Sequence, residues 1–360
     1  MRRKFILPVF LFLTHSPLAF AQGTDLREEQ VGALSFGLSY NMDAGASVSG
    51  RFQHSRLFGG NSRVDFGFDV SEDEQSYDLL FQSEAFGSGN PKLAFVLEHA
   101  TADLQSLMGI GTTKTKFRPQ AVFAFDEKTL TVEAIFGRDE VTAFAAAPAV
   151  LSAEAGSRDI YGMGVDLTGR WDALTYGVSG TLVTDGDGLT YGKIETEAAY
   201  RFPTQSEDTA FEARFAAGMI SVLDGQTTIN DRFLPSSGVL RGFEMGGFGP
   251  SDPAALGGAP VGSTNYAVMS LDYRRTGLIA AAPQVAIGGF IDVGSSWGLD
   301  DNGNADRAAI DDAARLRASA GLTISRDFGS ARVELVLSHP LQHQPTDRLR
   351  NVQIAFASKF

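Results

Sequence analysis

The chain has 360 residues, and its 30 Lys and Arg residues against 43 Asp and Glu residues give a formal net charge of −13. This charge argues against a nucleic-acid partner, because phosphate binding needs a basic surface. The sequence contains 40 Gly, 27 Phe and no Cys. So many Gly residues disfavour a helical bundle, since each costs about 1 kcal/mol in a helix interior. The lack of Cys excludes disulfides, thiolate metal sites and Cys nucleophiles.

The N-terminal residues have the pattern of a secretory signal. Residues 2–4 are basic, residues 5–13 are apolar, and residues 19–21 form a small-x-small cleavage site. The apolar stretch is shorter than the ~20 residues that a membrane-spanning helix needs. We therefore expect residues 1–21 to be a signal peptide and residues 22–32 to be a short periplasmic segment.

Most of the remaining chain alternates with a period of two residues. In the segment 191–202, one phase holds Ile194, Thr196, Ala198, Tyr200 and Phe202, and the other holds Lys193, Glu195, Glu197 and Arg201. A helix would mix these two sets, whereas a strand places them on opposite faces. The pattern therefore predicts β-structure with one apolar and one charged face.

About sixteen such segments of roughly ten residues follow one another, which is the length of a tilted strand that crosses a bilayer. They are 33–42, 45–56, 63–73, 75–86, 91–104, 114–127, 129–140, 157–171, 174–186, 190–202, 209–222, 264–276, 284–297, 315–327, 331–341 and 350–360. The three longest connections, 141–156, 223–263 and 298–314, all follow odd-numbered segments. Short turns at one end and long loops at the other are typical of outer-membrane barrels.

The prediction is therefore an all-β protein, a transmembrane antiparallel β-barrel of about sixteen strands over residues 33–360. A soluble periplasmic β-sandwich is the alternative, because its strands would also alternate. The one-sided loop lengths, the even number of segments and the C-terminal Phe360 favour the barrel. We expect it in the outer membrane of a Gram-negative bacterium.

The segment 231–250, DRFLPSSGVLRGFEMGGFGP, resembles the BamA/TamA family, the bacterial surface antigen superfamily of outer-membrane assembly factors. The family's V-R-G-F/Y motif corresponds here to Val239, Leu240, Arg241, Gly242 and Phe243, with Leu in place of the usual Val before Arg. Further similar segments are SLDYR, GFIDVGSSW, SAGLTIS and HPLQHQPTDR, in that order along the chain. The resemblance implies that the long loop carrying the motif folds into the barrel lumen.

The resemblance also implies a docking site for Arg241. In the family, the Arg of the motif contacts acidic residues on the inner wall of the twelfth and thirteenth strands, which correspond here to Asp272 and Asp292. The alternation of the thirteenth segment supports an inward position for Asp292, because Ile291 falls on the more apolar face. Since a barrel lumen is expected to be wet, we expect the pair to be worth little. An ordinary luminal ion pair is the alternative.

Two further expectations concern the ends of the barrel. Family members usually carry POTRA domains of roughly 75 residues before the barrel, so the short segment 22–32 suggests a barrel-only member. The family mechanism rests on the seam between the first and last strands, where Ile354, Phe356 and Phe360 form the terminal apolar row. In proteins of this class, such a terminal aromatic residue is a signal for the host's assembly machinery, and a plain last strand is the alternative. A Gly that kinks the last strand in relatives corresponds here to Ala357.

The functional hypothesis is therefore a barrel that inserts or translocates outer-membrane proteins or lipids. Expected partners are outer-membrane lipids, nascent outer-membrane proteins or an accessory periplasmic protein. A passive porin-like channel is the alternative, with Arg51, Arg63 and Lys193 among its luminal charges. A barrel hydrolase would need His99 or Ser296. We expect no enzymatic activity and no cofactor, and the sequence does not define the oligomeric state.

Overall fold

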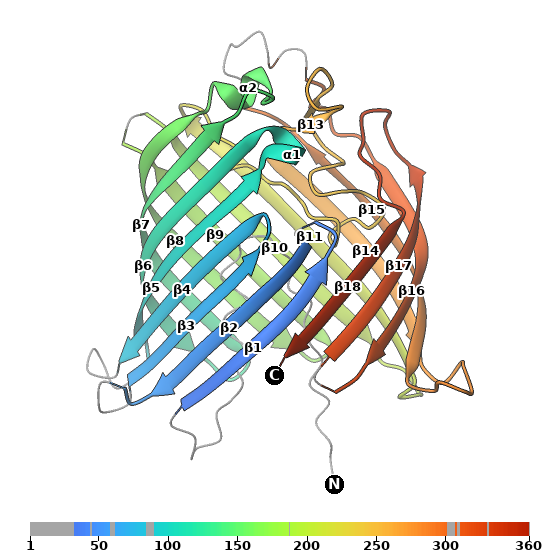
Figure 1. The fold of residues 1–360 in the computed structure, drawn as a ribbon. Coiled ribbons are helices and arrows are strands. Elements are labelled where there is room, and N and C mark those ends of the chain that lie inside the picture. The colour runs from blue at the N-terminus through green and yellow to red at the C-terminus, as the bar shows by residue number, and fades with distance from the viewer. Residues whose placement is uncertain are drawn as a thin grey trace.

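The computed structural model describes residues 32–43, 45–57, 62–83, 90–186, 188–300, 307, 310–329 and 331–359. These residues form a closed antiparallel β-barrel in which each strand pairs with its neighbour in the chain and the last strand pairs with the first (Figure 1). The predicted signal peptide, residues 22–31 of the predicted periplasmic segment, and Phe360 lie outside the described residues.

The barrel contains sixteen strands. They are β1 (Gly32–Asn41), β2 (Gly45–Ser55), β3 (Ser62–Ser71), β4 (Glu74–Ser83), β5 (Lys92–Leu104), β6 (Ile110–Ala124), β7 (Lys128–Ala143), β8 (Gly156–Trp171), β9 (Leu174–Thr184), β10 (Thr190–Phe202), β11 (Thr209–Asp224), β14 (Asn265–Arg275), β15 (Val285–Trp297), β16 (Arg317–Asp327), β17 (Ala331–Gln342) and β18 (Val352–Lys359). The prediction of about sixteen barrel strands is confirmed.

The alternation of the sequence becomes the two faces of the wall. In β10, Ile194 is 50% exposed on the outer face, while Lys193 and Glu195 form an ion pair of 3.4 Å on the inner face. In β15, Ile291 is 52% exposed and Asp292 is fully buried. Apolar side chains outside and paired charges inside are what a membrane-spanning barrel with a polar lumen requires.

The strand boundaries differ most at β6, which begins at Ile110 rather than at the expected residue 114. The short helix α1 (Gln105–Met108) and the turn at Gly109 connect β5 to this extension. Met108 and Ile110 are fully buried beneath the neighbouring connections, so burial of these two side chains accounts for the longer strand.

The long connections gather at one end of the barrel, which by their length is the extracellular end (Figure 1). The connection between β7 and β8 contains the helix α2 (Ala149–Ser152), and the connection between β11 and β14 contains the small sheet of β12 (Ser251–Asp252) and β13 (Ala259–Pro260). Both helices consist of four residues.

None of the helices in the described part of the chain is long and apolar enough to cross a membrane.

Candidate functional site

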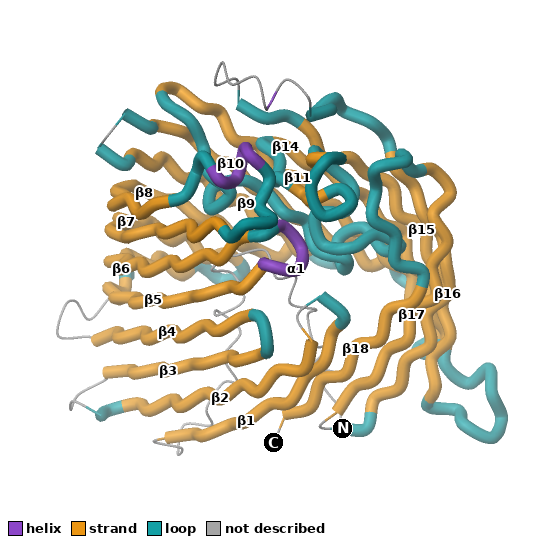
Figure 2. The backbone as a smooth tube through the Cα atoms, turned by 45° about the horizontal axis from the view of Figure 1, so that its top comes forward, coloured by secondary structure: helices purple, strands orange, loops and turns teal. Residues whose placement is uncertain are grey.

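Residues 225–264, here called the luminal loop, leave β11 and enter the barrel before β14 begins. The tilted view shows this segment inside the ring of strands (Figure 2). Its apolar side chains pack on the inner wall: Leu240 and Phe243 are fully buried, and they belong to one cluster with Tyr266 and Val268 of β14. The predicted folding of the long loop into the lumen is therefore confirmed.

Arg241 lies at the centre of the contacts between the luminal loop and the wall. Its main-chain N and its Nε donate to Oδ2 of Asp292 at 3.0 Å and 2.8 Å, and its Nη2 donates to Oδ1 of Asp292 at 2.5 Å. Its Nη1 donates to Oδ1 of Asp272 at 2.5 Å. The structure thus brings together the three charged residues that the motif and the resemblance singled out.

Two further contacts complete the surroundings of the guanidinium. The Arg241 Cζ lies 3.7 Å from the centroid of the Phe290 ring, a cation–π geometry. Arg214 of β11 also binds Asp272, with its Nη2 3.0 Å from Oδ2, so Asp272 serves two cations. Burial alone would lower the pKa of Arg241, but the hydrogen bonds and charges of Asp292 and Asp272 outweigh it and raise that pKa. The cation is therefore held firmly charged.

The expectation of a wet site with a weak ion pair is wrong in its premise. Arg241 is 6% exposed and Asp292 is 0% exposed, so little water reaches the pair. A buried charge that loses its partner costs about 3–5 kcal/mol, far more than an exposed one. The pair therefore anchors the luminal loop strongly.

Gly242 allows the chain to turn directly after Arg241. Its φ is +96°, a conformation that side-chain-bearing residues rarely adopt, and an added Cβ would lie 3.2 Å from Cβ of Ser319 on β16. The Ser319 hydroxyl donates to the carbonyl oxygen of Arg241. Next in the chain, Phe243 packs edge-on against Phe248 at 5.8 Å. Gly242 therefore permits the turn, and the packing of Phe243 on Phe248 holds the chain that follows it.

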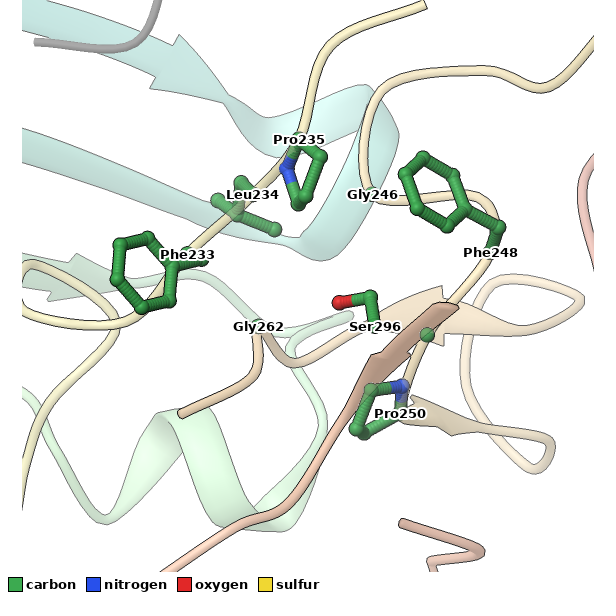
Figure 3. Close-up of a pocket in the computed structure, with 9 residues that line it drawn as sticks. Phe233, Leu234, Pro235, Gly246, Phe248, Pro250, Gly262 and Ser296 are labelled. Carbon is green, nitrogen blue, oxygen red and sulfur yellow. The ribbon is translucent and has the colours of Figure 1, made fainter. Parts of the chain in front are cut away.

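The luminal loop folds around a small, mostly apolar pocket (Figure 3). Phe233, Phe248 and Pro250 line it, together with Ser296 of β15. The Ser296 hydroxyl is 2.6 Å from that of Ser263. The pocket therefore lies where three stretches of the loop, around Phe233, Phe248 and Gly262, meet the barrel wall.

His99, the other residue considered for hydrolysis, lies on β5 and pairs with Thr115 at 2.9 Å. It also stacks on Tyr77. Within the described ranges, no cluster of three or more His, Asp or Glu side chains could hold a metal ion.

Sequence reasoning missed a second anchor of the luminal loop, at Asp231 and Arg232. Asp231 accepts from Arg158 Nη2 at 2.5 Å and from the Tyr191 hydroxyl at 2.9 Å. Arg232 donates through Nη2 to both carboxylate oxygens of Glu154, at 2.7 Å and 2.9 Å. Two adjacent charges in a loop rich in Gly and Pro are a usable signal, but their charged partners, Arg158 and Glu154, lie 73 and 78 residues away in the sequence.

Within the described residues, the seam joins β1 to β18 through four residue pairs, from Gly37 opposite Lys359 to Tyr40 opposite Phe356. By comparison, β1 pairs with β2 through ten residues. Ile354 is 44% exposed on the outer face. Ala357 lies opposite Ser39 in the register. Among the strand pairs of the described barrel, the seam has the fewest pairs.

The model of the Omp85 superfamily domain matches residues 56–360. A search of the curated proteins found no match. Among solved structures, BamA from Haemophilus ducreyi lacking POTRA domains 1–3 is similar at a TM-score of 0.74 and 15% identity, over 93% of this chain and 71% of that one. CdiB from Acinetobacter baumannii matches at 0.59 and 12% identity, and CdiB from Escherichia coli at 0.56 and 8% identity. These matches cover 92% and 91% of this chain but 60% and 63% of the CdiB chains. At these identities the likeness concerns the fold.

Proposed function

The chain belongs to the Omp85 superfamily, and from this membership we propose that it inserts proteins into the bacterial outer membrane or moves them across it. The observation that carries the proposal is the seam between β1 and β18, which has four residue pairs among the described residues. A sheet edge with few backbone partners can pair with an incoming strand, because its N–H and C=O groups are already aligned for a ladder.

The luminal loop supports the same proposal. The ion pairs of Arg241 with Asp292 and Asp272 hold the loop against the inner face of the barrel wall. There it occupies luminal space that a passive channel would leave open. We propose that nascent outer-membrane proteins are the substrate, that the membrane is that of a Gram-negative bacterium, and that the barrel acts without an enzymatic step. An accessory periplasmic protein would bring the substrate.

The test is assisted folding in vesicles made of outer-membrane phospholipids. An unfolded substrate barrel is added to vesicles with and without the protein, and its folding is followed as the heat-modifiable shift on gels. We expect faster folding in the presence of the protein. No acceleration, together with a steady conductance of uniform size in planar bilayers, would support the passive channel instead.

Vesicles loaded with the Arg241→Ala variant provide a second arm. The passive channel predicts higher conductance once the luminal loop is loosened. The insertion function predicts a changed folding rate of the substrate. The two functions therefore differ in which of these measurements responds.

A further inference from the structure

The extracellular end of the seam is held by side chains beyond the last strand pair. Backbone pairing between β1 and β18 stops at Tyr40 opposite Phe356. Asp43 lies in the turn after β1, and Arg350 lies shortly before β18. The Arg350 Nη1 donates to Oδ1 of Asp43, and the two side chains are only 16% and 11% exposed. A largely buried ion pair therefore bridges the two seam strands.

The luminal loop is the third partner of this contact. The main-chain N of Ser237 donates to Oδ2 of Asp43 at 3.0 Å, and the Ser237 hydroxyl donates to the same oxygen. Gln353 of β18 donates through Nε2 to the carbonyl oxygen of Ser237 at 3.3 Å. One carboxylate thus binds the β18 side of the seam with one oxygen and the luminal loop with the other.

The residues after Arg241 also bind the connection that leads into β18. The main-chain N of Arg350 donates to the Gly242 carbonyl at 2.9 Å, and that of Glu244 donates to the Arg348 carbonyl at 3.0 Å. The Arg348 Nε donates to Glu244 at 2.8 Å. Backbone hydrogen bonds therefore join residues 242–247 of the luminal loop to residues 348–350, directly before β18.

We propose that Asp43, Ser237 and Arg350 form a clasp that keeps the extracellular end of the seam closed and releases it only when the luminal loop moves. The proposal rests on the proposed function in one respect, since it concerns the regulation of the same seam. The physical reason is that the described residues of the seam form only four backbone pairs. Charge-assisted hydrogen bonds between largely buried side chains, by contrast, are strong. Asp43 is the residue that connects β1, the luminal loop and the segment before β18.

The test is amide hydrogen exchange on the folded barrel in vesicles, without any substrate. We compare the wild type with Asp43→Ala, and peptides from β1 and β18 with peptides from β9 and β10 in the same molecule. The matched control variant is Asp159→Ala, which removes an exposed ion pair with Arg138 between β7 and β8. The amide exchange rates in β1 and β18 should rise about tenfold in Asp43→Ala. The reason is that hydrogen bonds to a charged group stabilise a folded segment by a free energy that corresponds to about this factor. Exchange in β9 and β10 should not change, and the control should match the wild type.

The coupling to the luminal loop has its own arm. Arg241→Ala should also raise exchange in β1 and β18, and Asp43→Ala combined with Arg241→Ala should exceed the larger single effect only slightly. If Asp43→Ala does not fold, Ser237→Ala removes a single side-chain hydrogen bond and takes its place. Unchanged exchange at the seam, or an equal rise in β9 and β10, would overturn the clasp. Fully additive effects of the two substitutions would overturn the coupling. Because no substrate is present, the clasp can hold while assisted folding fails, or the reverse.

Discussion

Asp292 accepts three hydrogen bonds from Arg241 alone, at 3.0 Å from the main-chain N, 2.8 Å from Nε and 2.5 Å from Nη2. The contact joins a residue of the luminal loop to a residue of β15, 51 positions later in the chain. Since one bond comes from the backbone, the carboxylate fixes the path of the loop as well as the direction of the side chain.

Arg241→Ala should release the luminal loop without unfolding the barrel. The substitution leaves Asp292 buried without its cation, which costs about 3–5 kcal/mol of loop docking free energy. Cleavage by protease within residues 225–264 should increase, while the heat-modifiable folded band remains. Asp292→Ala should behave alike, and the double variant should be little worse than either single variant.

Arg138→Ala is the matched control for this pair, since the Arg138 side chain is 62% exposed and its ion pair with Asp159 measures 3.4 Å. It should leave protease protection unchanged. Additive losses for Arg241→Ala and Asp292→Ala would show that the two residues do not act through one contact.

Gly242→Ala should loosen the same loop by about 1–2 kcal/mol, because a side-chain-bearing residue pays that much for a left-handed backbone. The backbone φ there is +96°. Gly180→Ala on β9 is the control, since an added Cβ there would meet nothing within 4 Å. Urea-dependent protease cleavage of the loop measures both variants. Equal midpoints for the two variants would contradict the strain argument.

Arg232→Ala should free the extracellular part of the luminal loop. Its side chain is 0% exposed. Its removal leaves the Glu154 carboxylate, among the described residues, with Arg307 Nη2 at 3.3 Å and the Ile229 N–H at 2.8 Å. We expect new cleavage sites near residues 227–235 and near α2. Arg315→Ala, whose ion pair with Asp311 is exposed, should show none of them. Cleavage confined to the control, or absent from both, would rule out this anchor.

Acid should release the loop at Asp231. Burial alone would raise the pKa of Asp231, but the charge and hydrogen bond of Arg158 outweigh it and lower that pKa. A carboxyl group whose pKa is lowered in the folded state contributes its full stabilisation when the pH is above its unfolded-state pKa of about 3.9. This stabilisation is lost as the pH falls below that value. Cleavage by pepsin within the loop should therefore increase below about pH 4, and Asp231→Asn should weaken this pH dependence. A transition near neutral pH would point to another group.

The barrel could be predicted from the sequence because alternation is a local property. In the segment around Ile194 and Glu195, the alternation alone indicates which side chains face outward and which face inward. The same alternation in β15 predicted that Asp292 faces inward. The partners of Arg241 came from the resemblance, since pairing across 51 residues leaves no local pattern. The second anchor was missed for the same reason, because Glu154 lies in a different connection from Arg232.

Burial was the other quantity that the sequence did not provide. A luminal ion pair is expected to be hydrated when only the barrel wall is considered, whereas Arg241 and Asp292 are 6% and 0% exposed once the luminal loop is in place. The contact of Asp43 with Ser237 and Arg350 likewise depends on where three connections meet. Contacts of this kind between connections depend on how the whole barrel closes, so no local sequence pattern predicts them. The role expected for Phe360 stays a prediction, since this residue lies outside the described part of the chain.

The most direct measurement of the central claim is assisted folding by a barrel whose seam is covalently closed. The chain contains no Cys, so Tyr40→Cys with Phe356→Cys places one thiol pair at directly opposite positions of β1 and β18. Val178→Cys with Thr196→Cys places the control pair between β9 and β10. The account predicts that the oxidised seam pair abolishes the acceleration of substrate folding, that reductant restores it, and that the control pair has no effect. Full acceleration with the seam disulfide intact would contradict it.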